Sequence, residues 1–215
     1  MKRIIIARHG NTFNLDEIPT RVGAKTDLPL VETHRGLSIG RYLKENNMLP
    51  QKIYSAPLLR TTQTAELAVE AMGLNMGITT LNAFTEIDYG IDENKTEEEI
   101  MFRLGKGNIE EGKAIIDNWN KNATVPQGWN VDVPQIIESW INFAKLVEKS
   151  EYDTVLLVTS NGIIRFAPYL TGNFESFVKN NNIKVSTGGI CVFEKQNHAH
   201  WNCVIWNEKP YQKFN

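Results

Sequence analysis

A histidine and an arginine stand side by side near the start of the chain, in the stretch Arg8-His9-Gly10-Asn11-Thr12. A neutral imidazole is a competent nucleophile near neutral pH, and it forms a covalent intermediate that splits one difficult transfer into two easier steps. A guanidinium offers a fixed fork of donors that suits phosphate oxygens. The pair therefore predicts attack by His9 on a phosphate ester, with Arg8 holding the substrate's charge against the imidazole.

The other three histidines are weaker candidates for such chemistry. His34 falls where a helix is expected to begin and to face outward. His198 and His200 flank an expected turn between two strands near the C-terminus, where surface positions are usual. The alternative for His9 itself is a polar residue at a strand end without a chemical role, but the neighbouring arginine favours the nucleophile.

Two apolar stretches must position these groups. Residues 4–7 and 154–158 are short, continuous apolar runs rich in β-branched residues, which is typical of strands covered on both faces. The first leads directly into residues 8–12, and the second into Thr159-Ser160-Asn161-Gly162. In an open α/β sheet, ligands bind outside the carboxyl ends of the strands, where helix N-termini present N–H groups to anions. We therefore expect the two polar stretches to share one site.

The remaining expected elements alternate between helices and strands. Residues 11–32 are interrupted by prolines and a glycine, and we expect them to form a long loop that packs over another part of the chain and is not a linker. Further along we expect a helix over 33–47, a strand over 52–55, a helix capped by Ser55 with Pro57 in its first turn and ending at Gly73, a strand over 78–81, helical structure over 96–148 with a break at 124–134, a helix from about 163, and closing strands over 183–185, 190–194 and 201–206. This order predicts an α/β fold with a mostly parallel central sheet flanked by helices, in a single domain over residues 1–215.

Composition narrows the class of partner. The chain has 215 residues and a formal net charge of −2, which argues against nucleic acid or an anionic membrane, because either needs a net basic face. A small molecule is therefore the expected partner. The two cysteines lie in apolar stretches without metal-like spacing and are expected to be reduced thiols. No signal peptide and no membrane-spanning window are visible, so we expect a cytoplasmic location.

Metal-ligand motifs are missing from the sequence. There is no His-x-x-x-His, no paired Cys-x-x-Cys and no calcium-loop pattern. We therefore expect no metal ion and no cofactor.

Four blocks of the sequence carry a family resemblance. The stretch from Arg8 to Thr12 resembles the Arg-His-Gly signature of the histidine phosphatase superfamily, which includes phosphoglycerate mutases and many sugar-phosphate and nucleotide phosphatases. Residues 54–65 resemble that family's second block, residues 81–98 its acid-bearing block and residues 156–165 a fourth. The resemblance spans about residues 3–205 and is weakest over 105–150. It implies a phosphoglycerate mutase-like fold with a helical cap insertion at about 94–150.

The resemblance also implies roles for particular residues. His9 would accept the phosphoryl group while Arg8 and Arg60 clamp its oxygens. Glu86 would protonate the leaving alkoxide and then activate water, a task that suits a carboxylic acid of raised pKa. The alternatives are a solvated Arg60 on an amphipathic helix and an ordinary surface carboxylate at Glu86.

Residues of the long loop are candidates for contact with the substrate. Asn14 is expected to help orient the phosphate, although it sits one position earlier than the family's asparagine. Arg21, Gly23 and Lys25 are expected to line the site and to touch the rest of a phosphorylated substrate. The alternative for these three is a solvated loop.

The fourth block departs from the family pattern at Ser160. Where the family usually reads Ser-His-Gly-Gly, this chain has Thr159-Ser160-Asn161-Gly162, so a neutral donor replaces a positive one. A hydrogen bond to a charged group contributes about 1.5 to 3 kcal/mol and a neutral one about 1, so a rate lower by about tenfold is expected. Ser160 and Asn161 are expected to donate to the phosphate; the alternative is that one of them merely caps the following helix.

Three functions compete on this basis. The first is a metal-independent phosphatase acting on a small phosphorylated metabolite through a phosphohistidine. The second is a phosphoglycerate mutase. Ile87 and Asp88 disfavour it, because the resemblance implies an arginine and a histidine at these two positions in the mutases. The third is a low-activity phospho-ligand binding or regulatory protein, which Ser160 favours. The joint presence of a nucleophile and an acid argues against the third, and the sequence leaves the oligomeric state open.

Overall fold

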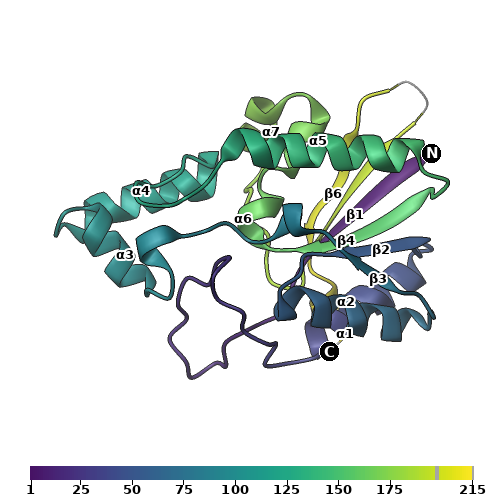
Figure 1. The fold of residues 1–215 in the computed structure, drawn as a ribbon, viewed down its shortest axis with the longest axis horizontal. Helices are drawn as coiled ribbons and strands as arrows, with labels where there is room; N and C mark the ends of the chain where they lie inside the picture. The colour runs from purple at the N-terminus through teal and green to yellow at the C-terminus, as the bar shows by residue number, and fades with distance from the viewer. Residues whose placement is uncertain (197–198, 215) are drawn as a thin grey trace.

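A six-stranded sheet forms the centre of the computed structural model, which describes residues 1–196 and 199–214 (Figure 1). Its strand order is β3-β2-β4-β1-β5-β6. The strands are β1 (Lys2–Arg8), β2 (Lys52–Ser55), β3 (Ile78–Thr80), β4 (Thr154–Thr159), β5 (Ile190–Lys195) and β6 (Asn202–Glu208). The first four are mutually parallel, while β5 and β6 run antiparallel to their neighbours. The predicted α/β fold with a mostly parallel sheet is confirmed.

Helices cover both faces of the sheet. On one face lie α1 (His34–Glu45) and α2 (Leu59–Met72); on the other lie α5 (Val133–Lys149), the one-turn α6 (Asn161–Ile164) and α7 (Phe174–Asn180) (Figure 1). The helices α3 (Glu97–Leu104) and α4 (Ile109–Asn122) extend beyond the sheet at one end of the molecule. Short 3₁₀ helices span Asn82–Phe84, Gly90–Asp92, Ala167–Thr171 and Pro210–Gln212.

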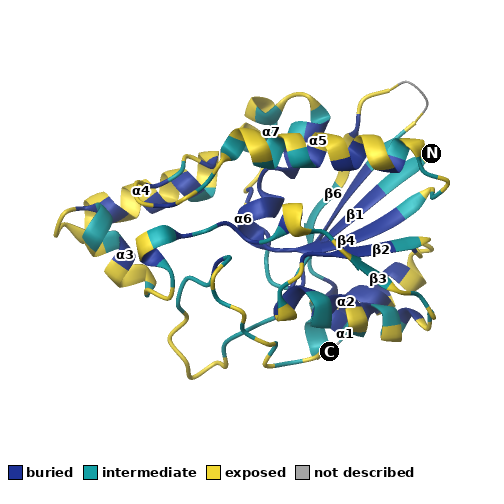
Figure 2. Cartoon of the chain, in the orientation of Figure 1, coloured by how far each residue is buried: buried dark blue, intermediate teal, exposed yellow. Residues whose placement is uncertain are grey.

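The alternation of side chains along β1 divides the core into two halves. Ile4 and Ile6 belong to the cluster under α5, whereas Ile5 and Ala7 belong to the cluster under α1 and α2. All four side chains are fully buried, and Figure 2 shows the central strands dark blue between both helical layers. This burial on two faces explains why the strand reads as a continuous apolar run.

One predicted strand is absent. Residues 183–185 form a loop, because side chains occupy the backbone groups that a sheet would need. The amide of Val185 donates to Oδ1 of Asn161 at 2.8 Å, and its carbonyl accepts from Nη1 of Arg8 at 2.5 Å. The backbone of Val185 thus connects Arg8 to Asn161 instead of joining the sheet.

Two further expectations about helices were wrong. Ser55 does not cap α2; it is the last residue of β2, and α2 begins at Leu59 after an extended Leu58. Pro57 keeps Ala56 out of the helix, since a proline disfavours helical backbone in the residue before it, and the extended Leu58 delays the start of α2 further. The stretch over 96–148 has the expected break at 124–134, but a second break at 105–108 separates α3 from α4.

Some predictions concern single residues outside the site. His34 begins α1 as expected and is half-buried, with Nε2 3.1 Å from the carbonyl of Tyr211. His200 is exposed, while His198 lies outside the described residues. Cys191 and Cys203 are both free thiols. Within residues 1–196 and 199–214, no helix has both the length and the apolar character needed to cross a membrane.

Candidate active site

The carboxyl ends of β1 and β4 bring the two polar stretches together. Arg8 is the register partner of Thr159 on the neighbouring parallel strand, so His9 and Ser160 follow at adjacent strand ends. The amide of His9 donates to the carbonyl of Thr159 at 3.1 Å and extends the pairing by one residue.

The hydrogen bond of the His9 ring fixes which nitrogen carries the proton. Nδ1 lies 2.7 Å from the carbonyl oxygen of Gly10, and because a carbonyl only accepts, Nδ1 is the donor. The lone pair is therefore on Nε2. His9 is only 7% exposed, and burial, together with the charges of Arg8 and Arg60, holds the pKa of the imidazole well below 6.5. The ring is neutral at physiological pH and has a free nucleophilic nitrogen.

Arg60 enters the site from the first turn of α2. The side chain is 1% exposed, and it donates from Nη1 to the carbonyl of Thr26 and from Nη2 to that of Gly23, at 2.7 and 3.1 Å. Thr64, one turn later, donates to the carbonyl of Arg60 and accepts from the amide of Gly10. The helix is thus tied directly to the residue that follows His9.

Three buried donors in this cluster have no hydrogen-bond partner among the described residues: Nε of Arg8, Nε of Arg60 and Oγ of Ser160. Each unpaired buried donor costs about 1 to 3 kcal/mol. Burial also lowers the pKa of both arginines, while the nearby carboxylate of Glu86 raises it. The site is short of acceptor atoms and of negative charge, which is the complement of a phosphoryl group.

Glu86 is buried in the same cluster. Its carboxylate accepts from the amides of Ile87 at 2.9 Å and Gly162 at 3.3 Å. Burial raises the pKa of the carboxyl above 4.5 and outweighs Arg60 and the two amides, which lower it. A Cβ at position 162 would lie 2.2 Å from Oε1 of Glu86, so the absence of a side chain at Gly162 lets the acid approach the end of β4.

Neither Ser160 nor Asn161 makes a side-chain capping hydrogen bond to the helix that follows the strand. Ser160 is the N-cap residue of α6, fully buried, and its side chain makes no capping bond. Asn161 uses Oδ1 to hold the amide of Val185. Because α6 is only one turn long, it has little helix dipole to offer an anion, contrary to the expectation of a full helix there.

Arg21 and Gly23 contact residues of the acid-bearing segment and Arg60. Arg21 forms an ion pair with Glu97, and its guanidinium lies 5.3 Å from the ring centre of Tyr89 and 5.0 Å from that of Trp129. Gly23 is buried, and a Cβ there would lie 2.5 to 2.6 Å from Glu93, Ile87 and Tyr89. These contacts position the loop against the acid-bearing segment, while the carbonyl of Gly23 orients Arg60.

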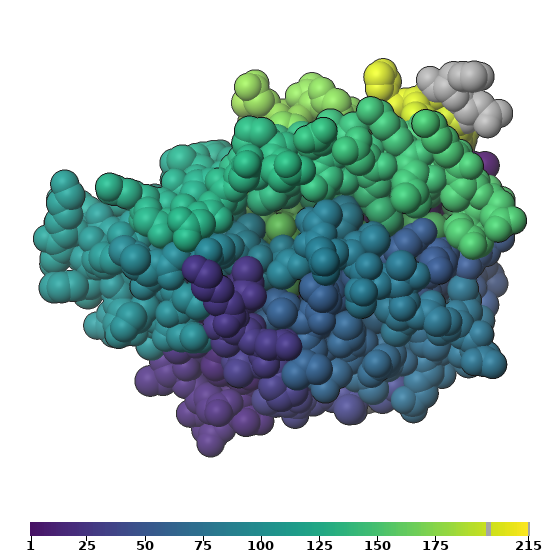
Figure 3. All heavy atoms as spheres, in the orientation of Figure 1, coloured from purple at the N-terminus to yellow at the C-terminus, as the bar shows by residue number. Residues whose placement is uncertain are grey.

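Lys25 and Asn14 are exposed, and the structure does not bring them into the buried cluster. Nζ of Lys25 pairs with Asp88 at 2.9 Å, and Nδ2 of Asn14 donates to Glu17 at 3.1 Å. Figure 3 shows the N-terminal loop, drawn in purple, on the surface between the teal helices α3 and α4 and the blue part of the molecule.

A further buried cation, Arg165, was not among the residues predicted for the site. Arg165 is 1% exposed, lies 3.8 Å from the ring centre of Trp119 and donates from Nη1 to the carbonyl of that residue at 2.8 Å. Burial lowers the pKa of Arg165 to about 10, and the charges acting on it include Tyr89 and Glu86. A lone arginine in an otherwise apolar stretch was the signal that could have identified it.

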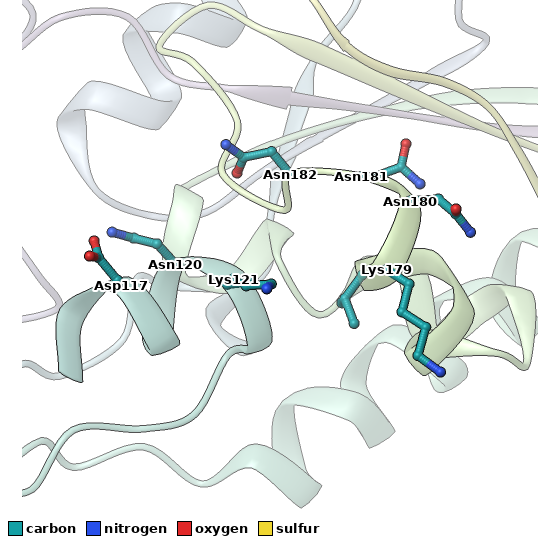
Figure 4. Close-up of a pocket in the computed structure, with 8 residues that line it drawn as sticks. Asp117, Asn120, Lys121, Lys179, Asn180, Asn181 and Asn182 are labelled. Carbon is teal, nitrogen blue, oxygen red and sulfur yellow. The ribbon is translucent and has the colours of Figure 1, made fainter. Parts of the chain in front are cut away.

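The chain also has a polar cavity of about 380 Å³, which lies between the end of α4 and the segment after α7 (Figure 4). Its lining is rich in amides: Asp117, Asn120, Lys121, Val178, Lys179, Asn180, Asn181 and Asn182. None of the predicted site residues lines it, so the candidate chemistry belongs to the strand ends and not to this cavity. Within the part of the chain that the structure describes, no three His, Cys, Asp or Glu side chains are grouped so that they could hold a metal ion.

Comparison with known proteins gives a family match over nearly the whole chain. The model of the histidine phosphatase superfamily (branch 1) matches residues 4–209. Among curated proteins, the search found no match.

Solved structures of low sequence identity share the fold. A phosphoserine phosphatase from Entamoeba histolytica, in complex with 3-phosphoglyceric acid, is 20% identical with a TM-score of 0.74, covering 98% of this chain and 99% of that one. A mycobacterial glucosyl-3-phosphoglycerate phosphatase is 20% identical with a TM-score of 0.74, covering 96% and 99%. A phosphoglycerate mutase from Bacillus anthracis is 16% identical with a TM-score of 0.79, covering 98% and 94%.

Proposed function

Because this chain belongs to the histidine phosphatase superfamily, branch 1, we propose that it hydrolyses a small phosphomonoester through a phosphohistidine on His9. The observation that carries the proposal is the set of unpartnered buried donors on Arg8, Arg60 and Ser160 beside a neutral histidine. A phosphoryl group offers only acceptor oxygens and negative charge, so it would supply what all three donors lack.

In the first step, Nε2 of His9 attacks phosphorus and the bond from phosphorus to the ester oxygen breaks. The guanidinium groups of Arg8 and Arg60 and the hydroxyl of Ser160 hold the phosphoryl oxygens during the transfer. The leaving alkoxide takes the proton of Glu86, whose raised pKa supports this role.

In the second step, the carboxylate of Glu86 takes a proton from water and the water oxygen attacks phosphorus. The bond from phosphorus to Nε2 breaks, its electron pair returns to the imidazole, and inorganic phosphate leaves. The charge that develops on the phosphoryl oxygens is opposed by arginine in both steps, so the proposed mechanism uses neither a metal ion nor a cofactor.

The mutase alternative finds less support in this site. Ile87 is buried, and Asp88 accepts from Lys25 and Asn130. Neither position supplies the positive charge that would hold a second charged end of the substrate as in the mutases. The alternative of a binding protein rests on Ser160, but it gives no role to the free Nε2 of His9 or to the buried carboxyl of Glu86, whose pKa is raised by burial.

The proposed substrate is a small phosphorylated metabolite, which the formal net charge of −2 supports over nucleic acid or an anionic membrane. The free thiols of Cys191 and Cys203 support a reducing, cytoplasmic location.

The test compares the wild-type protein with His9→Ala on a nitrophenyl phosphate in the presence of a chelator. We expect release of phosphate by the wild type, a loss of about 10³-fold or more in the variant, and an alkali-stable phosphohistidine after quenching the wild type only. His200→Ala, an exposed histidine, is the matched control and should keep the wild-type rate.

Other outcomes point elsewhere. Equal rates for the wild type and His9→Ala contradict the mechanism. Interconversion of 2- and 3-phosphoglycerate faster than phosphate release supports a mutase. Tight phosphate binding without any phosphohistidine supports a binding protein.

A further inference from the structure

Lys184 lies on a segment that is fixed to the candidate active site. Its neighbours in the chain, Ile183 and Val185, are both fully buried, while Lys184 itself is exposed. The amide of Val185 is held by Asn161 and its carbonyl by Arg8, at 2.8 and 2.5 Å. The backbone at Lys184 is therefore anchored one residue away from the arginine that stands beside His9.

The charges around Lys184 are mostly positive. Arg8, Arg21 and Arg165 all act on its ammonium group, and Glu97 is the carboxylate among the charges that act most strongly on it. Glu97 is already paired with Arg21. Although the residue as a whole is exposed, partial desolvation of its ammonium group and then the charge of Arg8 lower the pKa of Lys184. A cation in this position gains from any anion that approaches it.

Lys184 differs in this respect from the basic residues of the long loop. Arg21 has Glu97 as its partner, and Lys25 has Asp88. Lys184 forms no ion pair within residues 1–196 and 199–214. Of these three side chains, it is the one whose charge is available to a ligand.

We propose that Lys184 binds a second anionic group of the substrate, a carboxylate or a second phosphoryl group, while Arg8 and Arg60 hold the phosphoryl group that is transferred. The proposal rests on the function proposed above for where that phosphoryl group lies. A lysine suits this task, because its compact charge on a flexible stem adapts to anions of different shape. The substrate class is then a small phosphomonoester that carries a further negative charge.

The test measures binding without turnover, using three phosphonates that the enzyme cannot hydrolyse. Propylphosphonate carries one anionic end, 3-phosphonopropionate adds a carboxylate, and propane-1,3-diphosphonate adds a second phosphoryl-like group. Calorimetric titration of the full-length wild-type protein should give a dissociation constant about tenfold lower for at least one of the last two than for propylphosphonate. Which of the two is preferred distinguishes a carboxylate from a second phosphoryl group.

The variant Lys184→Gln should bind propylphosphonate as the wild type does and lose the preference, so that the ligands differ by about twofold at most. Lys179→Gln removes the same charge from an exposed residue of α7 and should keep the preference. Wild-type protein that binds the three ligands equally, or none of them, overturns the proposal, as does a preference that survives in Lys184→Gln.

Binding and turnover separate this inference from the proposed function. A preference that depends on Lys184, in a protein that forms no phosphohistidine and releases no phosphate, leaves the second anion site standing and overturns the phosphatase function alone. Turnover that depends on His9, without any such preference, does the reverse.

Discussion

Burial favours the neutral form of both His9 and Glu86. Because one is a base and the other an acid, their pKa values shift in opposite directions. Burial lowers the pKa of the imidazole and raises that of the carboxyl. A neutral imidazole and a protonated carboxyl are the states that the proposed first step requires. The same burial would thus prepare both the proposed nucleophile and the proposed acid.

Removal of the acid should depend on how much help the leaving group needs. In Glu86→Gln, kcat/KM for an alkyl phosphate should fall by about 10² to 10⁴-fold, because an alkoxide must be protonated as it leaves. The value for a nitrophenyl phosphate should fall by less than about tenfold, since that leaving group is stable as an anion. Steady-state rates with both esters provide the measurement.

The pH dependence gives a second reading of the same variant. The wild-type kcat/KM for the alkyl ester should decline as the pH rises through the pKa of Glu86, and this decline should disappear in Glu86→Gln. Equal losses for the two esters would assign Glu86 a structural role instead of that of a proton donor.

Ser160 should affect binding and stability in opposite senses. Its buried hydroxyl has no partner among the described side chains and backbone groups, so Ser160→Ala should leave the melting temperature unchanged or raise it. The affinity for inorganic phosphate should fall by about fivefold to tenfold, because a donor to the anion is lost. Calorimetric titration and thermal unfolding of both proteins check the two halves, and a lower melting temperature would indicate a structural hydroxyl.

The sequence sufficed for some site residues and not for others. His9 and Ser160 could be predicted because each directly follows an apolar strand, and parallel strands end at the same edge. Lys184 could not, because it lies in a stretch that reads as a strand and becomes a loop only through side chains far away in sequence. Asn14 was expected near the phosphate from the family resemblance, one position earlier than the family's asparagine, and in the structure it is exposed.

At the scale of elements, a buried carboxylate joins α3 to the acid-bearing segment. Asp92, in the 3₁₀ helix after Glu86, is 1% exposed and accepts from Nε of Arg103 and from Nε1 of Trp129, each at 2.7 Å. Trp129 in turn packs edge-on against Tyr89 with ring centres 4.7 Å apart. This contact connects the helices beyond the sheet with the site.

Loss of the Arg103 side chain should destabilise the contact between α3 and Asp92. Arg103→Met leaves the Asp92 carboxylate buried without the two N–H donors of the guanidinium, and the free energy of unfolding should fall by about 2 to 3 kcal/mol. Lys113→Met, which breaks an exposed pair with Asp117 inside α4, should leave the free energy of unfolding essentially unchanged, because exposed ion pairs contribute little. Denaturant titrations measure both, and equal losses would show that the buried pair has no special weight.

The bounds of helices and strands could be predicted from the sequence in some places and not in others. Strand β2 was predicted at its observed residues, 52–55. The break at 105–108 was missed because it depends on left-handed backbone at Lys106 and Gly107, with φ of 51° and 96°. A lysine gives no signal for that conformation, which L-residues seldom adopt.

At the scale of the whole molecule, the buried imidazole makes the stability of the fold depend on pH. Its pKa is lower in the folded chain than in the unfolded one, so the unfolded chain binds more protons below about pH 6.5. The contribution of His9 to stability is therefore full above that pH and is lost as the pH falls, by about 1.4 kcal/mol per unit until the folded-state pKa is reached.

His9→Gln should remove this contribution. The difference in free energy of unfolding between the wild type and the variant should shift in the variant's favour between pH 7.5 and pH 5.5, as measured by denaturant titration at several pH values. A difference that stays constant over this range would mean that the imidazole is not held neutral by the fold.

The global fold was the part most open to prediction. Apolar runs such as 4–7 and 154–158 are typical of strands covered on both faces, and such strands favour the layered α/β arrangement. The strand order and the placement of α3 and α4 depend on contacts between distant segments, which no local pattern contains. A helical cap over 94–150 within one domain therefore stays a prediction, since only α3 and α4 of that stretch extend beyond the sheet.

In the proposed function, the unpartnered donors of Arg8, Arg60 and Ser160 would bind the phosphoryl oxygens and not the group attached to them. Free inorganic phosphate offers them the same oxygens as an ester does. The released product should therefore compete with the substrate, so that turnover in a cell would follow the ratio of ester to free phosphate and slow as the product accumulates.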